Sequence, residues 1–289
     1  MLKYRFAFAK LVVRNFLIPY LQKKKICILK QCKKFIGGFF MAKNKVFTRK
    51  MAEKAVKRSG DIVISLGIEV IEDFAFANMK ELRSVSIPNT VKCIGYMAFA
   101  SCQNMKTIIV PESVECIEGS AFVSCTSIES IYIPEKVNFI EEYTFSGCKM
   151  LKNVSGMENV YNIGKGAFSS CSSLEEIDLP EGLMFIKSNA FESCDGLKRI
   201  FIPVSVMRIE HSAFAHCSHL REVIFDKSAQ LDRIPNDLFY DCTNLEYVNI
   251  PASIKYIENG AFGYCTSLRE VNIPNKVVRV GDTAFFGCK

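Results

Sequence analysis

The sequence lacks Trp altogether and has only three His among its 289 residues. It also lacks long hydrophobic runs near its N-terminus, where the longest uncharged stretches are about eight residues. A helix that spans a bilayer needs about 20 consecutive apolar residues. These short runs exclude a membrane-spanning segment in that region. Lys10 and Arg14 interrupt the first apolar run, which argues against a secretory signal.

The familiar motifs of catalytic and cofactor sites are absent as well. The sequence contains no G-x-S-x-G, Walker A, Rossmann glycine or H-E-x-x-H pattern. It has no C-x-x-C pair, which excludes zinc-ribbon spacing. The carboxylates are scattered and form no recognisable acid–base pair. We therefore expect a protein that is not an enzyme and that uses no cofactor and no small-molecule substrate.

What is present is an ordinary globular composition, with 49% hydrophobic and 23% charged residues, which excludes disorder and collagen. A disulfide-knot domain would be shorter and denser in Cys than this chain, which has 13.

The net charge of +7 is the sum of two segments of opposite sign. Residues 1–58 carry 17 Lys and Arg against one acid, Glu53, whereas residues 59–289 carry 20 Lys and Arg against 29 acids. A basic segment therefore precedes a mildly acidic body.

A repeat of 23 residues organises most of the chain. Nine Cys recur at this interval, with one interval of 25, and a Phe stands three residues before each Cys. One more step back gives Phe76, with Met79 in the Cys position, so about ten turns lie between residue 61 and the end. The expected core ladder consists of Phe99, Cys102, Phe122, Cys125, Phe145, Cys148, Phe168, Cys171, Phe191, Cys194, Phe214, Cys217, Phe239, Cys242, Phe262 and Cys265.

Residues 197–217 show one complete unit, LKRIFIPVSVMRIEHSAFAHC. The alternation of Ile200 and Ile202 predicts a strand with one buried face. Pro203 ends this strand because proline has no N–H for the ladder. The V-x-x-I segment then turns the chain back across the core, and A-F-x-x-C predicts one short helical or 3-10 turn. Since one turn cannot bury its apolar face alone, the turns should stack and align their strands into one parallel sheet.

The unit L-x-x-I-x-I-P-x-x-V-x-x-I-x-x-x-A-F-x-x-C, repeated over residues 61–289, resembles the BspA-like leucine-rich repeat family. The resemblance implies an α/β fold: a right-handed solenoid, or horseshoe, with a parallel sheet on its concave face and short helical or 3-10 turns opposite. It also implies a non-enzymatic function in protein binding or cell adhesion, at the cell surface or as a secreted protein. Because the chain shows no export signal, we expect a cytoplasmic location by default.

The Cys and Phe columns are expected to be structural. Met79 fills the Cys position of the first unit, which a packing role permits and a pairing role does not. Buried free Cys behaves as a small hydrophobe, and free thiols suit a reducing compartment. We expect packed, unpaired thiols beside a spine of stacked Phe, each buried ring contributing about 2–3 kcal/mol to stability.

The three His provide the alternative to a binding module. His211, His216 and His219 lie in one unit, and the last two could share a face of a compact turn, as a zinc site requires. Their equivalents in other units are surface-type residues, such as Ser188 and Asp241. We expect no metal at these positions, and we keep a metal-binding or catalytic protein centred on the three His as an alternative.

Recognition should use the two strand residues that flank each buried central position, on the concave side. These residues do not hold the fold, and interface anchors favour Tyr and Arg. A second explanation stays open, because β-branched and aromatic residues simply suit strands. The candidate binding residues are Ile109, Tyr132, Glu176, Arg199, Phe201, Glu222, Ile224 and Tyr247. The favoured patch consists of Arg199, Phe201, Glu222, Ile224 and Tyr247.

The two ends complete the domain prediction. Residues 41–60 should form an N-terminal cap, with a helix at 48–58 that begins at Thr48 and lays Met51 and Ala55 over the first turn. Residues 1–40 form a basic extension, interpreted as a non-native or mis-started segment, a membrane or targeting helix, or a nucleic-acid contact. The sequence stops at Lys289, directly after Cys288, so the last turn is open to fraying, a partner or self-association, or the chain is truncated there.

Overall fold

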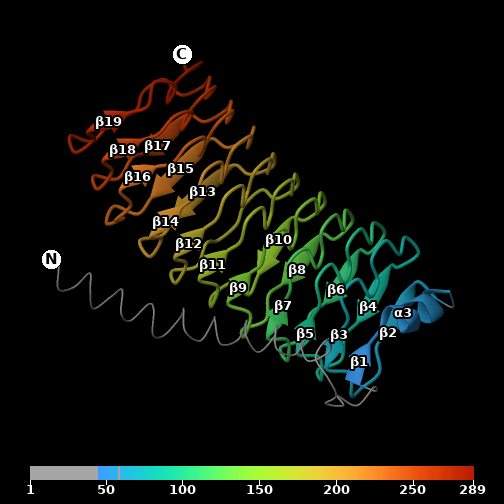
Figure 1. The fold of residues 1–289 in the computed structure, drawn as a ribbon. Helices are drawn as coiled ribbons and strands as arrows, with labels where there is room; N and C mark the ends of the chain where they lie inside the picture. The colour runs from blue at the N-terminus through green and yellow to red at the C-terminus, as the bar shows by residue number, and fades with distance from the viewer. Residues whose placement is uncertain (1–44, 58) are drawn as a thin grey trace, which may run out of the picture. The chain divides into compact units, whose positions relative to one another are not determined.

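The computed structural model describes residues 45–57 and 59–289, whose coils stack one beside the next in chain order (Figure 1). Contacts divide the chain into two units, Met1–Lys43 and Asn44–Lys289. The predictions made for residues 1–40 lie outside the described residues. Within the described ranges no helix has the length and the apolar character that crossing a membrane requires.

Most coils contribute a short strand in which the central side chain faces the core and the flanking ones point outward. Neighbouring strands pair in parallel at the repeat interval, so that Val85 lies between Ile62 and Ile108. This confirms the predicted parallel strands. We call them the first ladder: β2 (Asp61–Val63), β4 (Ser84–Ser86), β6 (Thr107–Ile109), β8 (Ser130–Tyr132), β10 (Asn153–Ser155), β13 (Arg199–Ile202), β15 (Glu222–Phe225) and β17 (Tyr247–Asn249).

The first ladder is interrupted between β10 and β13. Gly156 follows β10 with a φ of +76°, and a Cβ on this residue would lie 2.1 Å from the carbonyl oxygen of Ile133. Only glycine allows so close a backbone approach at a positive φ. In the next coil no strand is assigned over residues 171–182, although Ile177 is still buried. The interruption separates the two groups β2–β4–β6 and β8–β10 from the group β13–β15–β17.

A second set of parallel strands forms where the V-x-x-I segment crosses the core. Each strand has two residues, and in most of them the second is a buried Ile, as in β12, where Ile186 is fully buried. Phe47 takes the buried position in the first of these strands, whereas both residues of the last, Arg279–Val280, are exposed. The predicted single sheet is therefore wrong, because the repeat aligns this segment between coils as well. This second ladder consists of β1 (Val46–Phe47), β3 (Val70–Ile71), β5 (Cys93–Ile94), β7 (Cys116–Ile117), β9 (Phe139–Ile140), β11 (Asn162–Ile163), β12 (Phe185–Ile186), β14 (Arg208–Ile209), β16 (Arg233–Ile234), β18 (Tyr256–Ile257) and β19 (Arg279–Val280).

The A-F-x-x-C segments form hydrogen-bonded turns, so the predicted helical or 3-10 turns are wrong. The N–H of Cys102 donates to the carbonyl of Phe99 within its own coil, at 3.1 Å. The N–H of Phe99, by contrast, donates to the carbonyl of Ala121 in the next coil, at 2.8 Å. The N–H of Ser101 likewise donates to Val123, at 2.8 Å. Because alternate N–H groups bond to the neighbouring coil, no helix can propagate along the segment.

The predicted Phe column is the centre of the core. Its rings stack nearly parallel, with centroid separations from 4.9 Å for Phe76–Phe99 to 5.9 Å for Phe214–Phe239. Every Phe and Cys of the expected ladder is buried. The column also extends one ring further than the repeat indicated, because Phe47 of β1 stacks on Phe76 at 5.2 Å.

The one helix in the described ranges is α3 (Arg49–Val56), which lies beside β2 (Figure 1). Thr48 is its N-cap, as predicted, and the Thr48 side chain accepts a hydrogen bond from the Met51 N–H at 3.4 Å. The predicted covering residue Met51 is 42% exposed, whereas Ala52 is fully buried. The prediction for Met51 is therefore wrong. Ala55 packs against the core as a half-buried residue.

Candidate functional site

The outer face of the first ladder carries the side chains that flank its buried central positions. Ile109 of β6 is 78% exposed, and Tyr132 of β8 is 43% exposed. Glu176, in a coil that has no first-ladder strand, is exposed as well. The outward orientation expected from the alternation of each strand is therefore present at these positions. Their role in binding stays a prediction.

Five of the candidate residues come together on β13, β15 and β17. The parallel register places Arg199 beside Glu222, and Glu222 beside Tyr247. The second row places Phe201 beside Ile224. Tyr247 is 53% exposed and Phe201 44% exposed, whereas Glu222 and Ile224 are half-buried. We call this set the β13–β17 patch: Arg199, Phe201, Glu222, Ile224 and Tyr247.

The β13–β17 patch combines a cation that is only weakly paired within the chain with exposed aromatic and apolar side chains. The Nη2 atom of Arg199 lies 3.9 Å from the Oε2 atom of Glu176, and the two side chains are 71% and 77% exposed. An ion pair this long and this exposed contributes little to stability. The guanidinium of Arg199 can therefore pair with a carboxylate of a partner, while Phe201 and Tyr247 offer rings for apolar contact.

Ile109 and Tyr132 belong to the other part of the first ladder, before the interruption. The neighbouring Glu112 carboxylate raises the pKa of Tyr132 above its ordinary value. The structure does not join these two residues to the β13–β17 patch.

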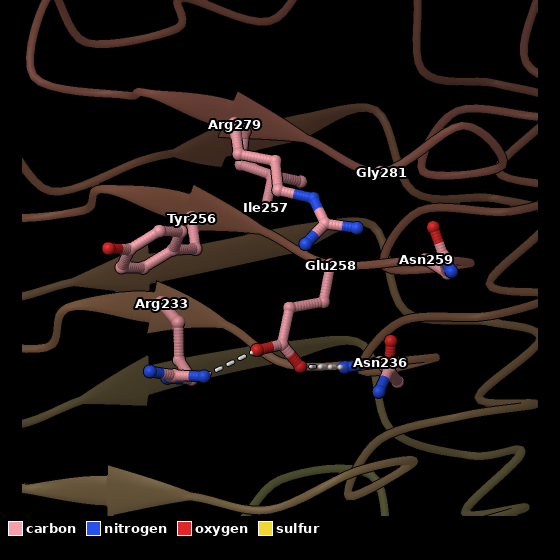
Figure 2. A pocket seen from close by; sticks show the side chains of 8 residues that line it. All are labelled: Arg233, Asn236, Tyr256, Ile257, Glu258, Asn259, Arg279 and Gly281. Carbon is pink, nitrogen blue, oxygen red and sulfur yellow. Dashed lines mark hydrogen bonds and ion pairs between the residues drawn. The ribbon is translucent and has the colours of Figure 1, made fainter.

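Two pockets lie on the second ladder, and His211 of the alternative His site lines the larger one. One has a volume of about 620 Å³ beside β14 and β16, and the other about 380 Å³ beside β16, β18 and β19. Figure 2 shows the smaller pocket, in which Glu258 lies between Arg233 and Arg279. Arg233 also stacks over the ring of Tyr256 at 5.4 Å.

The carboxylates of these pockets are held by neighbouring cations and hydrogen-bond donors. Arg233 donates to Glu258 at 2.6 Å. Burial alone would raise the pKa of Glu210, but hydrogen bonds from Lys187 and Ser188 hold that pKa below its ordinary value. Glu210 and Glu258 are therefore members of ion pairs between neighbouring coils.

The three His side chains contact three different partners. The Nδ1 atom of His211 lies 3.3 Å from the Ser188 hydroxyl. His216 Nδ1 lies 3.2 Å from an oxygen of Asp241. His219 Nδ1 lies 3.3 Å from the hydroxyl of Ser218. Among the described residues, the one group of three possible metal ligands with mutually close ligand atoms contains no His.

The buried cysteines are free thiols, and each donates its S–H to the preceding coil. Cys171 Sγ donates to the carbonyl of Phe145 at 3.2 Å, and the same contact recurs along the column. Burial raises the pKa of Cys148 to about 12. The Cys148 thiol therefore stays protonated at neutral pH. The sequence predicted their packing but not their hydrogen bonds.

Sequence reasoning missed a cluster formed by Cys93, Cys116 and Glu118, the group without His noted above. Cys93 and Cys116 stand 23 residues apart, the interval of the buried Cys column. That spacing was the available signal. This spacing did not lead to a predicted site, because the V-x-x-I segment was not expected to form paired strands.

Comparison with known proteins identifies the repeat. The family described as the BspA-type leucine-rich repeat region matches residues 58–175 and 162–289. No curated protein matches the chain. Several solved bacterial structures are similar. A leucine-rich repeat protein from Bacteroides ovatus is 28% identical, with a TM-score of 0.49, over 79% of this chain and 76% of that one.

Two further structures show the same kind of similarity. A leucine-rich repeat protein from T. pallidum is 24% identical, with a TM-score of 0.48, over 72% of this chain and 86% of that one. A leucine-rich cell surface protein from Faecalibacterium prausnitzii is 24% identical, with a TM-score of 0.40, over 80% and 86% of the two chains. The two family matches together cover residues 58–289, and the chain therefore belongs to the BspA-type leucine-rich repeat family.

Proposed function

We propose that the chain is a non-enzymatic, adhesion-type scaffold that binds a protein partner through the outer face of its first ladder. The observation that supports this most is the β13–β17 patch, in which a cation and a ring are exposed on β13 and a second ring on β17, with β15 paired between them. Membership of a leucine-rich repeat family supports the scaffold role. We take the solenoid to be right-handed with this face concave, as expected from the resemblance.

The proposed mechanism depends on a few anchors rather than on the whole face. Arg and Tyr are enriched among the residues whose truncation weakens an interface by about 2 kcal/mol or more. Arg199 would pair with a carboxylate of the partner, and Phe201 and Tyr247 would be buried against apolar side chains. The half-buried Ile224 would close the centre of the contact. Glu176 would lie at its edge.

The test is affinity capture with the full chain, comparing the wild type with the double variant Arg199→Ala/Tyr247→Ala. The captured proteins are quantified by mass spectrometry. Loss of two anchors should weaken binding by at least about 100-fold, so the partner should disappear from the capture. Thermal unfolding should not change, because both side chains are exposed and hold no part of the core.

A matched control replaces an Arg and a Tyr outside the outer face of the first ladder. Arg208→Ala/Tyr264→Ala removes the same two residue types, and both side chains are exposed. This variant should capture the same proteins as the wild type. If the Arg199→Ala/Tyr247→Ala variant still captures them, or if the control also loses them, the assignment of the patch is wrong.

A second candidate function is a peripheral membrane contact by the basic segment. The excess of Lys and Arg in residues 1–58 favours it, since cationic segments bind anionic lipid surfaces. Co-sedimentation of the same proteins with anionic vesicles separates the two candidates. Binding that is equal in the wild type and in the patch variant would favour the basic segment.

The compartment is also a proposal. The reduced thiols of the Cys column, each donating to a carbonyl, favour a reducing compartment such as the cytoplasm. Deep burial would also protect these thiols outside the cell, and the family resemblance supports a surface location as the alternative.

A further inference from the structure

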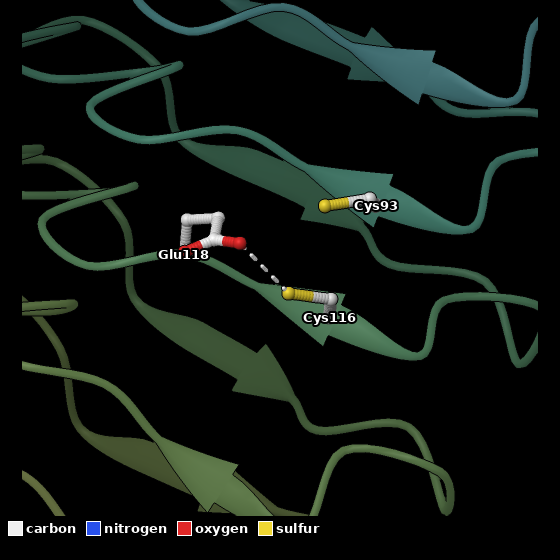
Figure 3. Close-up of side chains that lie close together, drawn as sticks. All are labelled: Cys93, Cys116 and Glu118. Carbon is white, nitrogen blue, oxygen red and sulfur yellow. Dashed lines mark hydrogen bonds between the residues drawn. The ribbon is translucent and has the colours of Figure 1, made fainter. Parts of the chain in front are cut away.

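Two cysteines stand outside the buried Cys column, on neighbouring strands of the second ladder. The parallel register of β5 and β7 places Cys93 directly beside Cys116. Glu118 follows two residues after Cys116, so it lies on the same side of the chain. Figure 3 shows the two sulfur atoms and the carboxylate gathered on one side of the two coils.

The ligand atoms of these side chains lie within reach of a single ion. Both Sγ atoms and a carboxylate oxygen of Glu118 lie within 4.8 Å of one another. The Cys116 S–H donates to Glu118 Oε1 at 3.3 Å. Ligand atoms at about 2.0–2.3 Å around a tetrahedral Zn²⁺ are separated by roughly 3.5–3.8 Å. Small side-chain rotations are therefore enough to close the cluster around an ion.

The surroundings distinguish these thiols from those of the buried column. Cys93, Cys116 and Glu118 are half-buried, so an ion and its water can reach them. Val70 occupies the position beside Cys93 in β3 and shields one side of the cluster with an apolar side chain. A thiol such as Cys171 is fully buried and donates to a carbonyl, which makes it inaccessible as a ligand.

We propose that Cys93, Cys116 and Glu118 bind a divalent cation of the zinc class. Two thiolates and one carboxylate form three ligands, and water fills the fourth position. Binding releases two thiol protons to solvent, so the complex forms from Zn²⁺, two thiols and a carboxylate without any change of oxidation state. Because the ligands come from two coils, the ion ties neighbouring turns of the solenoid together.

The test uses the full chain, reduced and kept free of oxygen, with Co²⁺ as a spectroscopic probe. The wild type should bind one equivalent and develop the absorption of thiolate-bound Co²⁺, which Zn²⁺ then displaces. Cys93→Val should abolish this absorption. Val at this position is expected to fold, since Val70 is its counterpart in the preceding coil. Glu118→Gln should weaken Co²⁺ binding by at least about tenfold.

The control variant is Cys27→Ser/Cys32→Ser, which removes the two cysteines that lie outside the described residues. It should bind Co²⁺ as the wild type does. Zn²⁺ should raise the melting temperature of the wild type and of this control but not that of Cys93→Val. The proposal is wrong if the reduced wild type binds no stoichiometric metal, if the absorption survives in Cys93→Val, or if it disappears in the control.

Discussion

The buried thiols contribute to the fold as hydrogen-bond donors as well as by their volume. The carbonyl of Phe145 accepts the N–H of Cys148 within its own coil, at 3.1 Å. The same carbonyl accepts the S–H of Cys171 from the next coil, at 3.2 Å. The thiol thus adds a second hydrogen bond to a buried carbonyl, which an apolar residue of similar size could not form. This bond exists only while the thiol is protonated.

Stability should therefore fall at alkaline pH. Burial raises the pKa of Cys148 from the ordinary 9.0 of a thiol to about 12. Above about pH 9 the unfolded chain loses this proton, whereas the folded chain keeps it. The stability that this group contributes is therefore fully present below pH 9 and is lost as pH rises towards 12. Urea unfolding of reduced protein at several pH values should show that the free energy of unfolding of the wild type falls as pH rises through this range. Cys148→Ala should make that fall less steep by about 1.4 kcal/mol per pH unit.

The reverse substitution is the control for this effect. Met79 occupies the Cys position of its coil and has no thiol. Met79→Cys should steepen the alkaline fall in stability, whatever it does to stability at neutral pH. An unchanged slope in both variants would show that the column does not stay protonated as described.

The turns after each Phe depend on residues with a positive φ. The residue two positions after the Phe has φ +57° at Ser101 and +60° at Ser170, and the equivalent in another coil is Gly147. A left-handed conformation costs about 1–2 kcal/mol for a residue with a Cβ, and β-branched residues tolerate it least. The alternating hydrogen bonds between coils depend on this conformation.

A pair of substitutions at Ser170 tests this element. Ser170→Val should lower the free energy of unfolding by about 1–2 kcal/mol, because a β-branched residue resists a φ of +60°. Ser170→Gly should change it by less than about 0.5 kcal/mol, because the relief of strain at this φ is offset by the greater entropy of glycine in the unfolded chain. Ser169→Val is the control, since Ser169 is the half-buried neighbour and has no positive φ. Equal losses at Ser169 and Ser170 would contradict the account.

The sequence predicted some elements and missed others for a physical reason. Ile200 and Ile202 alternate over enough residues to predict a strand, and the Phe and Cys spacing predicts which side chains are stacked. The second ladder was not predicted, because a two-residue strand such as Phe185–Ile186 is too short to show an alternation of apolar and polar residues. The conformation of the turns was not predicted either. Their N–H groups bond alternately within a coil and to the neighbouring coil, and the local sequence does not reveal bonds between coils.

At the scale of the whole molecule, the repeat specifies the stack of coils and leaves the outer faces free. Exposed positions such as Arg199 and Tyr247 can vary without loss of the fold, so the sequence could mark them as candidates but could not select a partner. The structure adds their arrangement, one patch on three paired strands. Cys93 and Cys116 became a candidate site only when strand pairing placed them side by side.

Side-chain footprinting of the chain in complex with its captured protein partner tests the central claim most directly. Hydroxyl-radical labelling reads exposed rings individually, and the β13–β17 patch contains Phe201 and Tyr247, which are 44% and 53% exposed. The account predicts that labelling of these two rings falls in the complex, while Tyr264 and Phe286 are labelled as in the free chain. Unchanged labelling of Phe201 and Tyr247, with protection confined to the second ladder or to residues 1–58, would contradict it.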